Sequence, residues 1–233
     1  MLFLDANNIT AKGAEGLTEC LKNKQDLRIL NLDNNRIEGE GVAKLSQQLK
    51  QNYGLSKLYL DANSIGPEGA KHIAVSLENM DSLKKICIEN NSIGDDGAIA
   101  VAKSLQDNDT LLSLYLEGNG ISEKGAAGLS KMLKNKVKLS KVNLSCNPIC
   151  DKGMDLISEG MMRNETLRVF TVADAQLTKA AIPKLSECIR NKLFLTKILL
   201  DNNRIGVDGA RLLAEGLAEN QTLTNLHLAQ CQI

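Results

Sequence analysis

The chain has 233 residues, and its 28 Lys and Arg residues balance its 28 Asp and Glu residues. This balance leaves no net field to attract nucleic acid or an anionic membrane. No apolar run approaches the roughly 18 residues of a membrane span, and the start lacks the basic and apolar regions of a secretory signal. We therefore expect neither a nucleic acid nor a membrane as partner.

The sequence repeats every 28 residues, and DNNRI at 33–37 recurs unchanged at 201–205. Counting in steps of 28 from Asn7 gives nine equivalent positions, and seven of them are asparagine. They are Asn7, Asn35, Asn63, Asn91, Asn119, Asn147 and Asn203. We expect each side-chain amide to pair with backbone groups that its turn would otherwise bury unpaired. A fixed period of this length is typical of a solenoid.

In chain order, each unit predicts a short strand, a turn and a helix. In residues 55–82, the alternation over Leu58–Leu60 favours a strand with its leucines inward. Apolar residues at 70, 73, 74 and 77 then follow with the spacing of one helical face. The first unit begins inside its strand, because Met1 aligns with Ile29, and the last ends before its helix. Strands joined by helices in one direction predict a parallel sheet backed by helices.

The pattern LxxLxLxxNxIGxxGAxxLAxxL, read from Leu55 to Leu77 with Ile73 in place of one Leu, resembles leucine-rich repeats of the ribonuclease-inhibitor type. The resemblance implies an α/β solenoid, a horseshoe with parallel strands on its concave face and helices on its convex face. Residues 1–233 would form a single array of seven full repeats with a partial repeat at each end. Similar units occur in NOD-like receptors and RanGAP-type proteins.

Two places depart from the pattern. In repeat seven, Ala175 replaces the asparagine and Ala181 replaces a glycine. We interpret both as drift that neighbouring units tolerate; a local kink or pocket near 174–181 is the alternative. The two ends show no polar cap, which solenoids need. We therefore expect an excised or uncapped array, with end-to-end self-association as one possibility.

Catalytic and metal-binding constellations are not found in the sequence. The two histidines, His72 and His227, lie more than five repeats apart, and Cys146 and Cys150 have no neighbouring His to complete a zinc site. We expect no enzyme activity, no cofactor and no metal. Six cysteines at unrelated repeat positions, without a secretory signal, favour a reducing cytoplasm.

The outward side chains of the strands predict a binding surface on the concave face. Its central row is Phe3, Asn31, Tyr59, Cys87, Tyr115, Asn143, Thr171, Leu199 and His227. One flank carries Ile29, Lys57, Lys85, Ser113, Lys141, Val169 and Lys197, and the other carries Asp5, Asp33, Asp61, Glu89, Glu117, Ser145, Ala173 and Asp201. Stacked acids repel one another, so a partner with a basic patch would offset the repulsion; the other interpretation is that these acids simply stay hydrated.

We predict a non-enzymatic protein-interaction module. Tyr59 and Tyr115 are its expected anchors, because tyrosine is favoured at interfaces. The flanking contacts would be Lys57 and Lys85 on one side and Asp61, Glu89 and Glu117 on the other. Three alternatives stay open: a RanGAP-like GTPase activator, the ligand-sensing arm of a NOD-like receptor, and a bacterial effector.

Overall fold

A computed structural model describes residues 1–22, 24–135, 138–191 and 194–233. Within them, nine strands form one parallel sheet in chain order and alternate with eight α-helices. The strands are β1 (Leu2–Phe3), β2 (Ile29–Asn31), β3 (Lys57–Tyr59), β4 (Lys85–Cys87), β5 (Ser113–Tyr115), β6 (Lys141–Asn143), β7 (Val169–Thr171), β8 (Lys197–Leu199) and β9 (Asn225–His227). The helices are α1 (Ala11–Leu21), α2 (Glu38–Leu49), α3 (Gly66–Leu77), α4 (Gly94–Ser104), α5 (Glu123–Lys134), α6 (Cys150–Arg163), α7 (Ile182–Asn191) and α8 (Gly206–Glu219).

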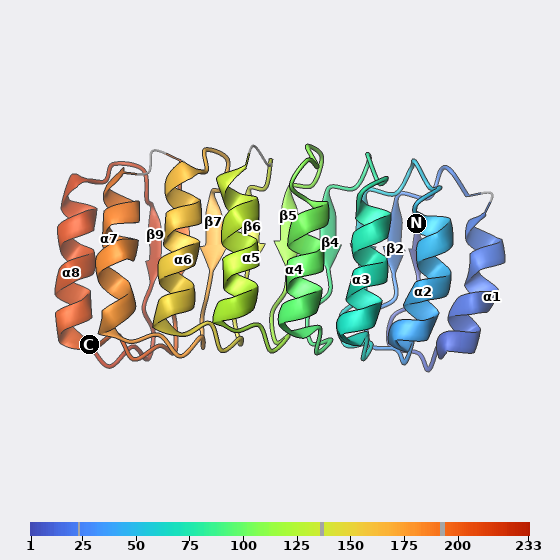
Figure 1. Ribbon diagram of the computed structural model, residues 1–233, viewed down its shortest axis with the longest axis horizontal. Coiled ribbons are helices and arrows are strands. Elements are labelled where there is room, and N and C mark those ends of the chain that lie inside the picture. Colours follow the sequence, from blue (N-terminus) through green and yellow to red (C-terminus); the bar gives the residue numbers. More distant parts are fainter. Residues whose placement is uncertain (23, 136–137, 192–193) are drawn as a thin grey trace.

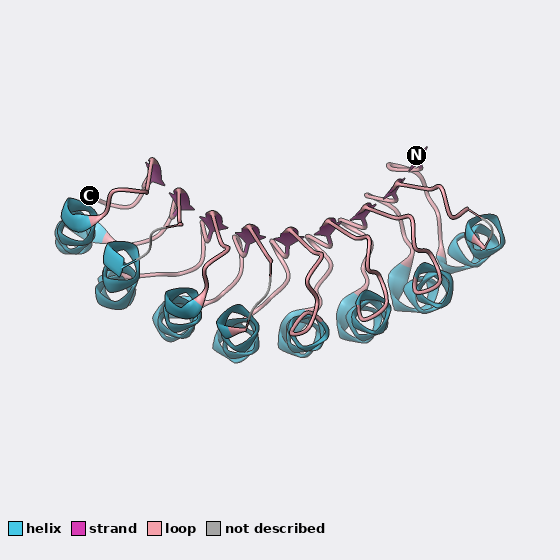
Figure 2. Cartoon of the chain, turned by 90° about the horizontal axis from the view of Figure 1, so that it is seen from above, coloured by secondary structure: helices cyan, strands magenta, loops and turns pink. Residues whose placement is uncertain are grey.

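The units stack side by side into an elongated array with its termini at opposite ends (Figure 1). Seen from above, the array follows a shallow arc, with the strands on the inner side and the helices on the outer side (Figure 2). Each strand pairs with the next one residue for residue, so that Leu58 lies between Leu30 and Ile86. The prediction of an α/β solenoid with a concave sheet and convex helices is confirmed.

The core lies between the sheet and the helices and is built almost entirely from aliphatic side chains. In the third unit, Leu58, Leu60 and Ile65 are 1–2% exposed, and Ile73 and Leu77 of α3 cover them from the helical side. Equivalent rows run through the neighbouring units. Each such side chain contributes about 1.5–3 kcal/mol on burial, so the repeated apolar pattern is what holds strand and helix together.

The turn asparagines form a buried hydrogen-bond ladder. Asn119 donates from Nδ2 to the carbonyls of Ile88 (2.8 Å) and Leu116 (3.0 Å), and its Oδ1 accepts the N–H groups of Asn91 (3.0 Å) and Ile93 (3.4 Å). The other buried members are Asn35, Asn63, Asn91, Asn147 and Asn203. Asn7 is exposed and donates to carbonyls of its own unit. Each buried ladder asparagine, such as Asn119, thereby links its own unit to the unit before it.

Two units build this turn without asparagine. In the last unit, the buried Cys231 Sγ donates to the carbonyl of Leu200 (3.2 Å) and takes over part of the amide's role. In repeat seven, Ala175 has no polar side chain, and the N–H of Ile149 bonds instead to the carbonyl of Asn147 at 2.7 Å. The carbonyl of Val172 still accepts the amide of Asn203 (2.9 Å). Asn203 of the following unit also accepts the N–H groups of Ala175 (3.1 Å) and Leu177 (3.0 Å), so it continues to hold this turn.

Ala181 fits repeat seven because Leu177 precedes it by four residues. At the equivalent Gly209, an added Cβ would lie 2.5 Å from Cγ2 of Ile205, which is too close. Leucine has no branch at Cβ, so its place in repeat seven leaves room for the methyl group of Ala181. Both residues are fully buried, and α7 is preceded by one 3₁₀ turn, Lys179–Ala181. The sheet register continues unchanged on both sides of β7.

Candidate functional site

The concave face presents three parallel rows of side chains in the predicted order. Parallel pairing places Tyr59, Cys87 and Tyr115 on adjacent strands of the central row. Lys57 and Lys85 are paired in the same way on one flank. Because neighbouring strands pair residue for residue, each row consists of residues 28 apart in sequence.

Lys85 reaches from its flank to a position between two tyrosine rings. Its Nζ lies 4.8 Å from the ring centroid of Tyr59 and 4.6 Å from that of Tyr115. Both distances are within the range of a cation–π contact. We call this arrangement the tyrosine slot. It brings three of the predicted site residues together at the middle of the array.

Cys87 lies in the central row between the two tyrosines but is only 4% exposed. The pKa of its thiol is raised to about 12, first because of burial and then because of the nearby negative charge of Asp61. The thiol is therefore protonated at neutral pH, and a protonated thiol is neither a nucleophile nor a metal ligand. The sequence placed Cys87 on the outward row correctly but gave no sign that its neighbours would cover it.

The acidic flank, which we call the acid row, consists here of Asp33, Asp61, Glu89 and Glu117. These residues are half-buried, so their carboxyl groups keep only part of their contact with solvent. Asp33 Oδ1 accepts the N–H of Asp61 (2.7 Å), and Asp61 Oδ1 accepts the N–H of Glu89 (2.6 Å). The two aspartates thus extend the inter-strand hydrogen bonding just beyond the strand ends.

Asn143 holds the two glutamates of the acid row together. Its Nδ2 donates to Glu89 Oε1 and to Glu117 Oε2, at 2.9 Å in each case. The amide therefore lies between two carboxylates that would otherwise face one another. The sequence showed Asn143 only as a member of the central row, and its bridging role depends on side-chain reach across two strands.

Burial raises the pKa values of three carboxyl groups in the acid row, Asp33, Asp61 and Glu89. The pKa of the Asp61 carboxyl is raised to about 7, chiefly because burial removes water, and also because Asp33 and Glu89 carry like charge. The N–H of Glu89 and the ammonium of Lys85 oppose this shift.

Other polar groups on the chain have structural roles that the sequence did not reveal. Asp95 Oδ1 accepts the N–H groups of Ser122 (2.8 Å) and Gly125 (2.8 Å), and its Oδ2 accepts the hydroxyl of Ser122 (2.7 Å). Two repeats later, Asp151 accepts the N–H and the hydroxyl of Thr178 in the same way. An acid in one unit therefore caps the next helix. The sequence feature that could have predicted this cap is an Asp placed 27 residues before a Ser or Thr.

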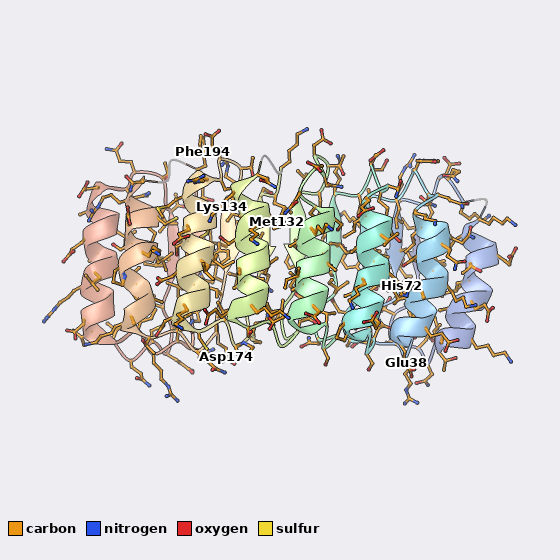
Figure 3. The ribbon with its side chains drawn as sticks, viewed as in Figure 1. Glu38, His72, Met132, Lys134, Asp174 and Phe194 are labelled. Carbon is orange, nitrogen blue, oxygen red and sulfur yellow. The ribbon has the colours of Figure 1, made fainter. Side chains whose placement is uncertain are left out.

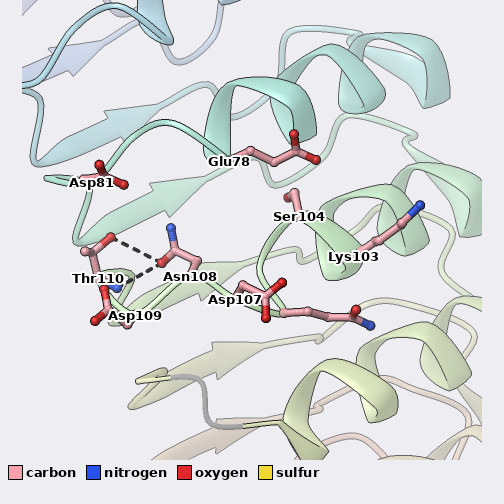
Figure 4. Close-up of a pocket in the computed structure, with 9 residues that line it drawn as sticks. Glu78, Asp81, Lys103, Ser104, Asp107, Asn108, Asp109 and Thr110 are labelled. Carbon is pink, nitrogen blue, oxygen red and sulfur yellow. Dashed lines mark hydrogen bonds between the residues drawn. The ribbon is translucent and has the colours of Figure 1, made fainter.

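A depression at the end of α3 and α4 is also acidic (Figure 4). It is lined by Glu78, Asp81, Asp107 and Asp109, together with Lys103. Within the described residues, no group of three or more His, Cys, Asp or Glu side chains is arranged to hold a metal ion. The depression lies at the loop edge of the array, away from the tyrosine slot.

The histidines and loop cysteines do not come together. His72 lies on α3 at the outer side (Figure 3), whereas His227 lies on β9, with its Nδ1 3.9 Å from Asp201 Oδ2. Cys146 Sγ contacts Glu117 Oε1 (3.5 Å), and Cys150 Sγ contacts Gln176 Oε1 (3.6 Å). Among the described helices, none is long and apolar enough to cross a membrane.

Comparison with known proteins identifies the repeat. A family model described as "Leucine Rich repeat" matches residues 23–46, 82–102, 107–130 and 135–158. This match does not distinguish the ribonuclease-inhibitor type from other types. Among solved structures, the chain is similar to leiomodin-1 actin-binding site 2 (ABS2), with 17% identity and a TM-score of 0.45, over 74% of this chain and 87% of that chain. No curated protein matches the sequence.

Proposed function

This chain is a leucine-rich repeat protein, and from that premise we propose that it is a non-enzymatic protein-interaction module that binds a protein partner on its concave face. The observation that carries the proposal is the tyrosine slot at mid-array, with Lys85 held between Tyr59 and Tyr115. Side chains here are supported by strands on both sides. A pre-ordered aromatic surface loses little conformational entropy when a partner binds.

The remaining site residues flank the slot within two strands of it. Lys57 is exposed beside Lys85, and Asp61, Glu89 and Glu117 line the opposite flank. Charged groups around an aromatic anchor set the orientation and association rate of a partner more than its affinity. The concave face thus combines a candidate energetic anchor with a charged rim, as protein interfaces do.

The test compares concave and convex variants of the same protein in affinity capture, followed by measurement of Kd with the purified partner. Tyr115→Ala removes a half-buried ring and no core side chain, so the thermal midpoint should barely change. Binding should weaken by about 2 kcal/mol, as at interface hot spots. Lys131→Glu, on α5, is the convex control and should keep the partner. If the convex variant loses the partner and the tyrosine variant keeps it, the concave-face proposal is wrong.

A further inference from the structure

The tyrosine slot already holds a cation, and that cation belongs to the protein itself. Tyr59 and Tyr115 lie on strands separated by β4, which corresponds to a backbone separation of roughly 9.6 Å. This separation admits one alkyl-ammonium chain between the rings. Lys85 fills the space, with its Nζ 4.8 and 4.6 Å from the two ring centroids.

The surroundings of the slot favour additional positive charge. The acid row places four carboxyl groups beside it, and their half-buried positions leave them short of water. On β2–β5, beside the acid row, the opposite flank carries two lysines, Lys57 and Lys85, against four acids; its next lysine, Lys141, lies on β6. Burial raises the pKa values of Asp33, Asp61 and Glu89, and the like charge of neighbouring carboxylates adds to the rise, so a cation placed beside these groups would favour their charged form.

We propose that the tyrosine slot receives a Lys or Arg side chain from a basic segment of the protein partner, and that Lys85 is an internal occupant which this side chain displaces. The inference rests on the proposed concave-face function and names the chemistry of the partner. Lysine suits the role of a displaceable occupant, because its long flexible stem and strongly hydrated head can swing into water. The incoming cation gains both rings and, in addition, the acid row.

An acidic partner fits this face less well. A carboxylate or phosphate aimed at Lys85 would have to approach within the field of the acid row, and like charges brought together at an interface weaken binding strongly. Lys85 is also engaged by the two rings, so an anion would compete with them for the same ammonium.

Fluorine NMR gives a direct test, because the chain contains only three tyrosines. Protein labelled with 3-fluorotyrosine has one resonance each for Tyr53, Tyr59 and Tyr115, assigned with Tyr→Phe variants. Tyr53 is 66% exposed and lies in the loop between α2 and β3, so it serves as the internal reference. Titration with capped hexalysine should move the resonances of Tyr59 and Tyr115 and leave that of Tyr53 in place.

Matched lysine variants test the displacement. Lys85→Gln empties the slot and should tighten hexalysine binding by about fivefold, because the cation–π contacts of Lys85 with the two rings no longer compete. Lys57→Gln removes the same charge one strand away and outside the slot, and it should change the affinity by less than about twofold. Tyr115→Phe keeps the ring and should bind like the wild type, whereas Tyr115→Ala should bind less tightly.

Several results would overturn the inference. Weaker or unchanged hexalysine binding by Lys85→Gln would show that Lys85 is not a displaceable occupant. Movement of the Tyr59 and Tyr115 resonances by capped hexaglutamate, but not by hexalysine, would assign the slot to an acidic partner while keeping the concave face as the binding surface. If neither peptide moves these two resonances, the basic-segment inference is wrong, and the concave-face function is judged separately by the Tyr115→Ala and Lys131→Glu pair with the native partner.

Discussion

Single residues of this protein often serve two units at once. The side chain of Asn119 joins its own turn to the unit before it, and Asp61 accepts a backbone N–H from the neighbouring unit. Truncating such a side chain to alanine leaves a backbone partner in the neighbouring unit unpaired. The effect of a substitution therefore depends on the neighbour's backbone as much as on the residue itself.

Asn119→Ala should lower the free energy of unfolding by about 1–3 kcal/mol, because two buried N–H groups and two buried carbonyls lose a partner. Urea unfolding measures the change. Asn34 is the natural control, because it lies one residue from the ladder; its φ of 56° is in the left-handed region, where glycine is the least strained replacement. Asn34→Gly suits this backbone, and Gly118 occupies the equivalent position at φ 65°. Equal losses in Asn119→Ala and Asn34→Gly would contradict the ladder.

Asp61→Asn should stabilise the protein in a pH-dependent way. The folded pKa of about 7 lies above the ordinary value of 3.8, so the stability linked to Asp61 is complete below about pH 4 and is lost as the pH rises through about 7. Since the carboxyl keeps some solvent contact, the variant should exceed the wild type by only about 1–2 kcal/mol at pH 8, and match it near pH 4. Urea midpoints at the two pH values give the comparison.

Asp208→Asn is the opposite-sign control for that experiment. Its hydrogen bond with Lys179 lowers the pKa of Asp208, so its contribution is present above the ordinary pKa and disappears as the pH falls. This variant should be slightly less stable than the wild type at pH 8. A stability gain at pH 8 in both variants would point to general charge removal in place of the burial of Asp61.

At the scale of the element, each helix is fixed to its own turn by close contact. The turn isoleucine packs against a glycine four residues later, and the short distance between them leaves no room for a methyl group. Repeat seven changes both partners together, to Leu177 and Ala181. The two positions therefore act as a pair that sets how closely the helix approaches the turn.

Gly209→Ala should destabilise the protein by about 1–3 kcal/mol, because the new Cβ lies 2.5 Å from Cγ2 of Ile205. Ile205→Leu removes that branch and should cost about 1 kcal/mol alone. In the double variant the two losses should not add, and a double-mutant cycle in urea should give a favourable coupling of about 1 kcal/mol. Additive losses would contradict the paired fit seen in repeat seven.

At the scale of the whole molecule, the stability of each unit depends on its contacts with the units on either side. In such an array it is approximately a sum of unit terms and nearest-neighbour terms. The boundary between repeats six and seven lacks one rung of the asparagine ladder, because Ala175 provides no amide. We expect the array to open there more readily than at its centre.

Ala175→Asn should restore the missing rung and stabilise the protein by about 1 kcal/mol. Its amide oxygen would accept the N–H groups of Asn147 and Ile149, as in the other units. Native-state hydrogen exchange should then show slower exchange of these two amides, with little change near Asn63. A loss of stability would mean that the core has closed around the methyl group of Ala175.

The sequence by itself determined the solenoid, the sheet order, the rows of the concave face and the position of every ladder asparagine. It could do so because a period of 28 without insertions places equivalent residues side by side, whatever the details of packing. Tyr59 and Tyr115 followed from the alternation of strand side chains alone.

Only the tertiary structure determined which contacts the long side chains make across neighbouring strands. Lys85 turns inward between two rings, Asn143 spans two glutamates, and Cys87 is covered by its neighbours. A repeat pattern gives the origin of each side chain but not its rotamer, and reach across one or two strands depends on rotamers and on which neighbours occupy the intervening space. Burial of the acid row, and with it the raised pKa of Asp61, arises from the same crowding.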